Sequence, residues 1–318
     1  MDKCAELLPD YFSFVKGLVD SEDLSLNISR ETLQHDGQLK LIAKTLEKKI
    51  KSELEKMLKD EREAYEEFFK AFGIQLKFGV YNDYGMHKDA LKDLLIFRSS
   101  AEKKYVTLKE YVSRMAEGQD TIYYACGETD EKIDMLPQAD AVKDKGYEIL
   151  YLTENVDEFA VKMMGEYDGK KFVNICDENL NLDSEDEKKA LNEENEAAKD
   201  MFEAMKESIG DKVNAVRFTN KLKNHPVCLT SEGGISLEME KVLNSMPGAE
   251  QNKVKAQLVL EINASHPIAE KLKKLYTDDK DTLSKYAKLL YGEACLIGGK
   301  TVPDPAEHSA LVCELMTK

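Results

Sequence analysis

The sequence predicts an α/β fold followed by an α+β domain, with a small αβα subdomain after a helical connector and a mixed-sheet domain that ends in two helices. Three observations support this fold class. An amphipathic helical pattern fills much of the first third of the 318 residues, and strands alternate with helices between residues 121 and 176. In the last third, alternating strands precede two helices.

The first third predicts a helical connector. Residues 7–19 mix aromatic and aliphatic side chains and indicate a strand. From about Arg30, apolar residues recur every three or four positions and extend to Gly73, a plausible helix C-cap. Because this length exceeds a normal helix, we expect a break near Asp60. Residues 81–117 are predicted to be helical again. The apolar positions of the first helix are Leu39, Ile42, Leu46, Ile50, Leu54 and Leu58.

Short strands and helices alternate in the middle of the chain. Strands separated by helices at this interval are typical of βαβ crossovers, so we expect a parallel sheet. The expected order is strand, helix, strand, helix and strand, over Thr121–Ala125, Met135–Lys145, Tyr147–Thr153, Val156–Met164 and Lys171–Cys176.

The composition changes after this segment. Residues 177–200 carry ten acidic residues against three lysines, a density typical of a domain boundary or of a solvated helix start. We therefore place a domain junction near Asp183. A helical stripe ending at Gly210 follows, and its residues are Met201, Met205 and Ile209.

The last third predicts strands and then two terminal helices. Apolar and polar residues alternate over residues 213–220, 225–232 and 253–265, as in half-buried strands. Thr282–Leu296 and Pro305–Met316 are amphipathic helices that cannot easily bury two faces within one small domain. We therefore expect dimerisation helices that pair with a second copy of the chain. The apolar residues expected at this homodimer interface are Leu283, Tyr286, Leu289, Leu290, Leu311 and Leu315.

Charge and hydropathy exclude several classes of protein. A net charge of −16 argues against nucleic-acid binding and against binding to an anionic membrane, because both need a cationic surface. No apolar run approaches the roughly 20 residues of a membrane span. The N-terminus has neither a basic region nor an apolar region of the kind that begins a secretion signal. We expect a cytoplasmic protein.

No motif of a self-contained enzyme or metal site is present in the sequence. The six cysteines show neither CxxC nor His-x-Cys spacing, which favours reduced thiols over a zinc site. The phosphate-binding loop, the dinucleotide-binding glycines, the nucleophile elbow and the HExxH pattern are missing. With six cysteines and five histidines, chance Cys–His pairs are unavoidable and carry little weight.

Four segments, in order along the chain, resemble the chaperones of the heat-shock protein 90 family. Leu7 to Gln34 reads LLPDYFSFVKGLVDSEDLSLNISRETLQ, which closely resembles the middle-domain signature of that family. Ile149–Ile175, Val216–Leu229 and Leu260–Ile268 are similar to further family motifs. The chain ends in ELMTK, without the Met-Glu-Glu-Val-Asp tail that tetratricopeptide co-chaperones bind, which resembles the bacterial, HtpG-like branch.

The resemblance implies a division of the chain. Residues 1–35 are expected to be the tail of the large middle subdomain with its catalytic loop, and 36–105 the helical connector. Residues 106–182 are then the small αβα middle subdomain, and 183–318 the C-terminal dimerisation domain. We expect a fragment without the ATP-binding domain, which is not an enzyme and holds no cofactor, whereas the full-length protein is an ATPase that uses ATP and magnesium.

The resemblance also assigns two candidate catalytic residues. Arg30 occupies the place of the family's middle-domain arginine that reaches the γ-phosphate of ATP, and Gln34 that of its polar partner. A guanidinium at a helix start can stabilise phosphoryl charge, and a spacing of four residues places Gln34 on the same helix face. The alternative is that Arg30 is simply a solvated residue at a helix start.

A second resemblance suggests a client-binding surface. Ile235, Met239, Val242 and Met246 form an apolar stripe that resembles the exposed amphipathic helix facing the cleft of the family's dimer. Methionine is flexible and polarisable, which suits the binding of varied non-native clients. Packing of the stripe into the core is an equal alternative. For the whole chain, the alternatives to a chaperone segment are a constitutive dimeric scaffold or adaptor and, third, a free-standing enzyme.

Overall fold

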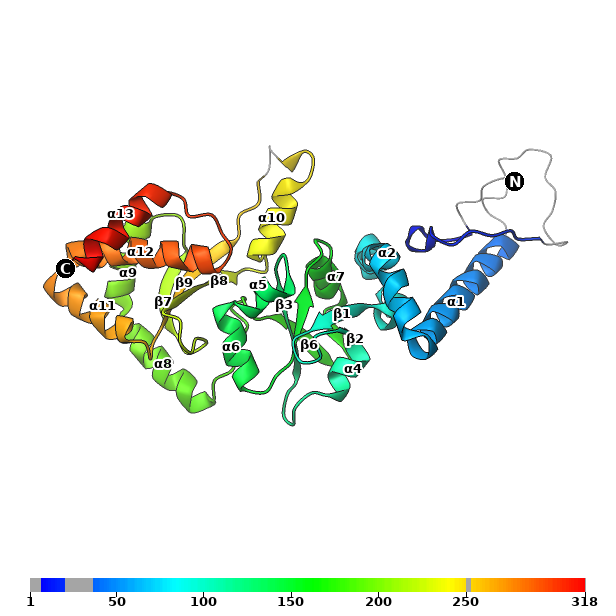
Figure 1. Cartoon of the computed structure of the whole chain (residues 1–318), viewed down its shortest axis with the longest axis horizontal. Helices are drawn as coiled ribbons and strands as arrows, with labels where there is room; N and C mark the ends of the chain where they lie inside the picture. The colour runs from blue at the N-terminus through cyan, green and yellow to red at the C-terminus, as the bar shows by residue number, and fades with distance from the viewer. Residues whose placement is uncertain (1–6, 21–36, 250–252, 318) are drawn as a thin grey trace. The chain divides into compact units, whose positions relative to one another are not determined.

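The computed structural model describes residues 7–20, 37–249 and 253–317, which form two compact units (Figure 1). Unit 1 consists of Met1–Arg114 with Val156–Lys171, and unit 2 of Met115–Asn155 with Phe172–Lys318. Each unit therefore contains two separate stretches of the chain. In the part of the chain that the structure describes, no helix is long and apolar enough to cross a membrane.

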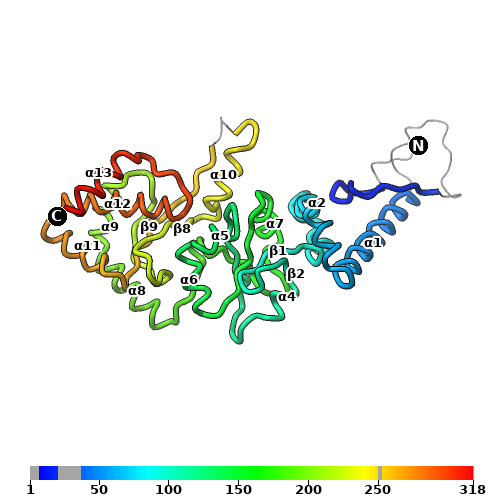
Figure 2. The backbone as a smooth tube through the Cα atoms, viewed as in Figure 1, coloured from blue at the N-terminus to red at the C-terminus, as the bar shows by residue number. Residues whose placement is uncertain are grey.

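Two long helices form the helical part of unit 1. Helix α1 (Gly37–Asp60) ends where α2 (Arg62–Tyr81) begins, and Glu61 between them has the non-helical angles φ −135 and ψ 57. The expected break near Asp60 is thus confirmed, and Figure 2 shows the turn of the chain at this point. Helix α2 buries one face because its apolar residues recur every three or four positions. The buried residues of that face include Tyr65, Phe69, Leu76 and Val80.

Two predictions for the first third are wrong. The segment predicted as a strand at residues 7–19 contains the 3-10 helix η1 (Asp10–Phe12) instead, whose Tyr11 and Phe12 are buried. Gly73 does not end a helix but lies inside α2, where a Cβ atom would come within 2.7 Å of the Phe69 ring. Glycine at this position therefore makes room for an aromatic side chain one helical turn earlier.

The rest of unit 1 is built from short elements. The predicted helix over residues 81–117 is interrupted by a hairpin in which β1 (Ile96–Ser99) pairs antiparallel with β2 (Tyr105–Thr107). Helix α4 (Leu108–Ser113) follows with a capping box from Thr107 and Glu110. The other short elements are η3 (Asn82–Gly85), α3 (Lys88–Leu91), η4 (Lys92–Leu94), α7 (Asp157–Met164) and β5 (Glu166–Tyr167), and β5 pairs antiparallel with the start of β6 (Lys170–Asn174).

A buried ion pair joins α2 to α7 in unit 1. Lys77 Nζ lies 2.6 Å from Asp157 Oδ1, and both side chains are almost fully buried. The rings of Phe69 and Phe97 lie within 5.2 and 5.5 Å of the ammonium group. The pair fixes two segments that are distant in the sequence, because removal of either partner would leave an uncompensated buried charge.

The first part of unit 2 contains the predicted βαβ crossover. Strand β3 (Thr121–Cys126) pairs parallel with β4 (Ile149–Leu152), and α5 (Asp130–Asp134) and α6 (Pro137–Asp144) lie between them in the chain. The expected parallel pairing is confirmed. All four residues of β4 are buried, as in a strand covered on both faces.

The acidic segment of residues 177–200 lies within unit 2 and contains a solvated helix. Helix α8 (Glu185–Ala197) starts with a capping box from Ser184 and Glu187. Its acidic residues lie on a helix without a buried residue, which agrees with a solvated helix start. Helix α9 (Lys199–Ile209) then buries the predicted stripe, and Gly210 follows with φ +76.

A mixed three-stranded sheet and three helices form the main core of unit 2. In the order β7-β9-β8, strand β9 (Gln257–Asn263) is parallel to β7 (Ala215–Thr219) and antiparallel to β8 (Val227–Glu232). Six of the seven residues of β9 are buried, so this strand is not half-buried as expected. The remaining helices are α10 (Leu237–Ser245), α11 (Pro267–Asp278), α12 (Lys280–Ile297) and α13 (Pro305–Met316), and α9, α11 and α12 pack against the sheet.

The α/β content and the mixed sheets of the predicted fold class are confirmed. Helix α11 was not predicted, although His266 at its N-cap and Pro267 at its first turn are a recognisable start signal. The finer division into residues 1–35, 36–105, 106–182 and 183–318 stays a prediction.

Candidate functional site

The two candidate catalytic residues, Arg30 and Gln34, lie outside the residues that the structure describes. The remaining candidates lie on α10 or directly beside its ends, on α12 and on α13, all in unit 2. Their positions can therefore be compared within one compact unit.

The stripe on α10 lies at the surface of unit 2. Ser236 caps the helix by accepting a hydrogen bond from the Met239 backbone N–H at 3.1 Å, and no residue of the helix is buried. Met239 and Val242 are half-buried. Ile235 precedes the helix and packs against the core, whereas Met246 follows the helix and is 49% exposed. The four residues thus extend beyond both ends of α10.

Polar contacts hold α10 against the segment of unit 2 that precedes β9. Glu240 Oε2 accepts a hydrogen bond from the Ala256 backbone N–H at 2.9 Å. One turn later, the Asn244 amide donates to the Val254 carbonyl at 2.8 Å and accepts from the Val254 N–H at 2.9 Å. These bonds tie α10 to the chain segment that leads into β9, so the helix does not depend on apolar burial for its position.

The terminal helices place their apolar residues in two different environments. Leu283 and Leu290 of α12 are buried in the core of the chain itself, and Tyr286 packs against that core. Leu289 is half-buried. In α13 no residue is buried, and Leu311 and Leu315 are half-buried. The apolar surface of this region is therefore concentrated on α13 and beside it.

Helix α13 is held to α12 by polar and close-packed contacts. The distances are 2.6 Å for Lys285 Nζ to Glu314 Oε1 and 2.8 Å for Lys288 Nζ to Glu307 Oε1. The His308 ring lies against Gly292, where a Cβ atom would approach Nδ1 to 2.3 Å. Glycine in α12 thus permits a close approach of α13.

A buried charge network connects the three strands of the mixed sheet. Glu261 on β9 accepts hydrogen bonds from Arg217 Nη2 at 2.7 Å and from the Thr230 hydroxyl at 2.8 Å, and Lys221 Nζ lies 3.4 Å away. Burial by itself would raise the pKa of the Glu261 carboxyl. The charges of Lys221 and Arg217, together with these hydrogen bonds, outweigh burial and lower that pKa below its usual range.

Two parts of unit 2 are joined next to this network. The Ser231 backbone N–H donates to the Cys176 carbonyl at 3.0 Å, and the Glu178 N–H donates to the Ser231 carbonyl at 3.1 Å. Lys221 also donates to the Asp177 carbonyl at 3.5 Å. The segment after β6 is thereby fixed to the edge of the mixed sheet.

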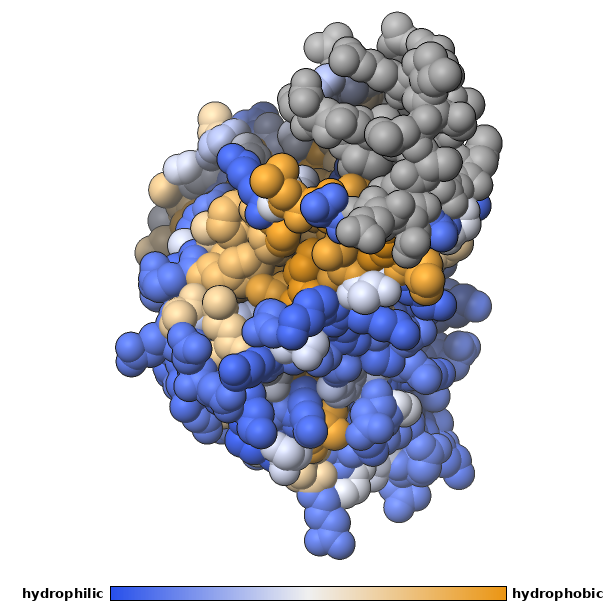
Figure 3. All heavy atoms as spheres, turned by 90° about the vertical axis from the view of Figure 1, so that its right-hand side faces the viewer, coloured by the Kyte–Doolittle hydropathy of each residue, from blue (hydrophilic) through white to orange (hydrophobic). Residues whose placement is uncertain are grey.

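Two further surface features were not predicted. Helix α2 exposes Ile74, Phe78 and Tyr81 along one face, and Figure 3 shows apolar side chains gathered at this end of unit 1. Unit 2 contains a cavity between α5, α10 and the end of α12. Among the described residues, no group of cysteine, histidine or acidic side chains has the arrangement of a metal site, and the described cysteines are free thiols.

Comparison with known proteins gives a family. The model of the Hsp90 protein family matches residues 1–318, the whole of this sequence. The chain belongs to the Hsp90 family. The resemblance that rested on four sequence segments is thereby confirmed.

Curated Hsp90 relatives show high identity to the chain. It is 57% identical over 316 residues to the chaperone protein HtpG of Clostridium perfringens, and 56% identical over 316 residues to that of Bacillus subtilis. The identity to the chaperone protein HtpG of Clostridium botulinum strain Loch Maree is 55% over 316 residues. Each of these alignments covers 99% of this chain and 50% of the relative, so the chain spans about half the length of these chaperones.

Proposed function

We propose that this chain dimerises and binds non-native client proteins as part of an Hsp90 chaperone. The observation that carries the proposal is that α10 and α13 bear apolar side chains but contain no buried residue. Apolar helix faces that the folded chain does not cover are typical of surfaces that bind other proteins. Two such helices lie in a single unit.

Dimerisation is assigned to α13 together with the adjoining face of α12. Leu311 and Leu315 are half-buried, and Met316 at the end of α13 is 81% exposed. Pairing with the same helices of a second copy would cover these side chains in an isologous helical bundle. Leu283 and Leu290 already lie in the core of the chain. In this proposal they do not contact the second copy but pack beneath the residues of α12 and α13 that do.

Client binding is assigned to the stripe of Ile235, Met239, Val242 and Met246. Of the two alternatives for this stripe, a client surface and core packing, the exposure of Met246 and the absence of a buried residue in α10 support the first. The polar tethers at Glu240 and Asn244 keep the helix in place while its apolar side chains stay accessible.

The ATPase role belongs to the full-length protein. We propose that Arg30 and Gln34 act there on the γ-phosphate of ATP, which is bound with magnesium by another domain. This proposal is supported by the family membership and by the match of residues 7–34 to the family signature. A cytoplasmic location also stays a prediction.

Suppression of aggregation tests the proposed function. The chain should slow the aggregation of a chemically denatured model client at stoichiometric concentration, and Met239→Gln with Met246→Gln should weaken this effect. The matched control is Met86→Gln, because Met86 is 76% exposed in unit 1, outside the stripe. A chain that dimerises but leaves aggregation unchanged would support the scaffold or adaptor instead.

A further inference from the structure

Strand β7 lies at an edge of the mixed sheet in unit 2. In the part of the chain that the structure describes, β9 is the strand that pairs with it, and the sheet order ends at β7. A strand in this position directs the N–H and C=O groups of every second residue away from the sheet. Such groups form a template on which a strand of another chain can pair. What covers the outer edge of β7, the edge that faces away from β9, therefore decides whether the chain associates through this sheet.

The directions of the backbone groups identify the residue that faces outward. The Thr219 carbonyl accepts a hydrogen bond at 3.1 Å from the N–H of Ala264, which directly follows β9. Because successive residues of a strand direct their backbone groups to opposite sides, the N–H and C=O of Phe218 point to the outer edge. Both groups face helix α8, where they have a partner.

Asn195 of α8 binds both backbone groups of Phe218. The Phe218 N–H donates to Asn195 Oδ1 at 2.7 Å, and the Asn195 amide nitrogen donates to the Phe218 carbonyl at 3.3 Å. A side-chain amide carries an acceptor and a donor side by side, as a peptide group does. Asn195 therefore makes the two hydrogen bonds that a residue of a neighbouring antiparallel strand would make.

Few contacts hold α8 over this edge. The helix contains no buried residue. Leu191 lies four residues before Asn195, on the same helix face, and packs against the core of unit 2. Glu194 pairs with Lys273 of α11 at 2.7 Å, and the Lys273 ammonium group lies 5.1 Å from the centre of the Phe218 ring. These contacts place Asn195 opposite β7 although α8 itself is a solvated helix.

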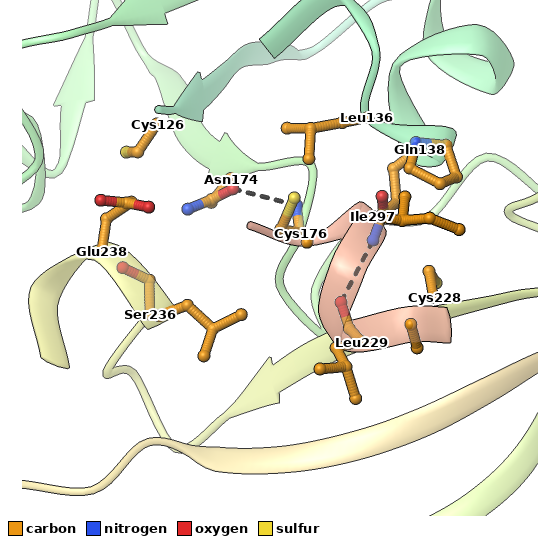
Figure 4. A pocket seen from close by; sticks show the side chains of 14 residues that line it. Cys126, Leu136, Gln138, Asn174, Cys176, Cys228, Leu229, Ser236, Glu238 and Ile297 are labelled. Atoms are coloured by element: carbon orange, nitrogen blue, oxygen red, sulfur yellow. Dashed lines mark hydrogen bonds between the residues drawn. The ribbon is translucent and has the colours of Figure 1, made fainter. Parts of the chain in front are cut away.

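The other edge of the sheet is covered in a different way. At β8, the Ser231 N–H donates to the Cys176 carbonyl, and the Ser231 carbonyl accepts from the Glu178 N–H. A second amide, that of Gln138 on α6, donates to the Leu229 carbonyl at 3.2 Å (Figure 4). A chain segment thus pairs with the outer edge of β8, whereas the hydrogen bonds at the outer edge of β7 come from a side chain.

We propose that Asn195 covers the outer edge of β7 and prevents this strand from pairing with β7 of a second copy of the chain. Two identical edges can meet antiparallel about a twofold axis, so an uncovered β7 always has a partner in solution. While Asn195 occupies the N–H and C=O of Phe218, a second strand finds no free groups at this residue. The inference goes beyond the proposed function, because it concerns a surface that is kept closed rather than one that binds.

The chemistry of the amide defines three variants of Asn195. Asn195→Leu leaves both groups of Phe218 without a partner, which favours displacement of α8 and exposure of the edge. Asn195→Asp keeps an acceptor for the Phe218 N–H, whereas Asn195→Lys provides none. The aspartate and the lysine each add a charge, and like charges that meet at two paired edges oppose association.

Amide exchange tests the hydrogen bond itself. Hydrogen–deuterium exchange followed by NMR measures the protection of the Phe218 N–H in the intact chain. In Asn195→Leu and in Asn195→Lys, this N–H should exchange roughly tenfold faster than in the parent chain. In Asn195→Asp it should exchange as slowly as in the parent. The matched control is Asn192→Leu, the same substitution at an exposed position of α8, which should leave the exchange of Phe218 unchanged.

Sedimentation velocity at rising protein concentration tests the association. Asn195→Leu should form assemblies larger than those of the parent chain. Asn195→Lys, Asn195→Asp and the control Asn192→Leu should sediment like the parent. Each variant is compared with the parent whatever the size of the parent assembly, so the result is independent of the proposed dimerisation and client binding.

Four results would overturn the proposal. The first is a Phe218 N–H that exchanges as slowly in Asn195→Leu as in the parent. The second is fast exchange in Asn195→Leu without association, because the contact would then serve only the fold. Equal association of the leucine and lysine variants would assign the association to another surface. Loss of a cooperative thermal melt in Asn195→Leu would place Asn195 among the residues that hold the fold, rather than at the edge alone.

Discussion

Glu261 is a carboxylate with 1% exposure in the middle of a sheet, and its partners come from both neighbouring strands. Arg217 on β7 and Thr230 on β8 donate hydrogen bonds to it, and Lys221 adds a second positive charge. A buried charge of this kind costs stability when a partner is lost, because the remaining ions stay in a region of low dielectric constant. The network therefore sets the positions of three strands relative to one another.

Removal of this charge should destabilise unit 2. Glu261→Gln removes the carboxylate that pairs with Lys221 and leaves Arg217 paired with Glu232 alone, at 3.0 Å, so we expect a loss of about 1–3 kcal/mol in the free energy of unfolding at pH 7. Urea denaturation followed by circular dichroism measures this loss. The control is Glu185→Gln on the solvated helix α8, which should change the free energy by less than about 0.5 kcal/mol. Equal effects of the two substitutions would contradict the structural role of Glu261.

The same network predicts a pH dependence. The pKa of Glu261 is lower in the folded chain than in the unfolded chain, where it is about 4.3. Its contribution to stability is therefore present above the unfolded pKa and is lost as the pH falls through the folded pKa. As the pH falls from about 6 to about 3, the free energy of unfolding should decrease more for the parent chain than for Glu261→Gln. Urea denaturation at each pH measures this difference. Parallel curves for the two proteins would refute this assignment.

Two thiols should be inert in the folded chain. Burial, and then the nearby Glu261 carboxylate, raise the pKa of the Cys228 thiol well above its usual range. Burial also raises the pKa of Cys295. Because the thiolate is the reactive form, a maleimide should modify both residues only as fast as the chain unfolds, and the exposed Cys313 should react first. Mass spectrometry after pulse labelling follows each site, and fast labelling of Cys228 in the folded chain would contradict this prediction.

At the scale of single elements, α10 permits a test that separates a client surface from a core helix. Polar substitution of the 49% exposed Met246 should change the free energy of unfolding by less than about 0.5 kcal/mol, whereas a core methionine would cost about 2–5 kcal/mol. Thermal melts of Met246→Gln and Met239→Gln beside a client-binding titration measure both effects. A large fall in melting temperature without a change in client binding would mean that the stripe serves packing.

Periodicity predicted some elements well and others poorly, for physical reasons. The helix break at Glu61, the βαβ crossover and α13 were predicted because their apolar residues recur with a clear period of 3.6 or their strands alternate with helices. Strand β1 was taken for helix because Leu94 to Phe97 is a continuous apolar run, which has no period. Gly73 was predicted as a helix C-cap, but glycine is needed there because the Phe69 ring packs closely against its backbone. Such a contact cannot be seen in the local sequence.

Sites that combine distant residues were beyond sequence reasoning. The stripe from Ile235 to Met246 lies within one segment and could be predicted, together with its two alternatives. The cavity between α5, α10 and the end of α12 brings Met135 together with Glu238 and Leu296, which are separated by up to about half of the chain. Such a juxtaposition follows from the packing of two parts of unit 2 and leaves no local motif in the sequence.

At the scale of the whole molecule, we propose that another domain of the full-length protein binds ATP. We therefore predict that this chain alone neither binds nor hydrolyses ATP. It has no phosphate-binding loop, and an arginine with a glutamine cannot hold a triphosphate. Calorimetry with magnesium and ATP should therefore give no heat of binding. Stoichiometric binding of ATP would contradict the assignment of Arg30 as a group that acts on a nucleotide held elsewhere.

In the full-length protein, Arg30→Ala should lower the rate of ATP hydrolysis at least roughly tenfold, which is about 1.4 kcal/mol of transition-state stabilisation. Nucleotide affinity should change much less, because in the proposed arrangement another domain would hold the adenine and the inner phosphates. Single-turnover kinetics and a nucleotide-binding titration give the two quantities. Equal losses in rate and affinity would indicate a ground-state contact, and an unchanged rate would indicate a structural residue.

We propose that the chain is the dimerising part of an Hsp90 chaperone, and its mass in solution tests this proposal most directly. Multi-angle light scattering at micromolar concentration should give about twice the 36.0 kDa of one chain. Leu311→Asp, which places a charge on the uncovered face of α13, should give a folded monomer, while the control Leu41→Asp in unit 1 stays dimeric. A parent chain that is monomeric at this concentration would contradict the account, as would a Leu311→Asp variant that remains a dimer.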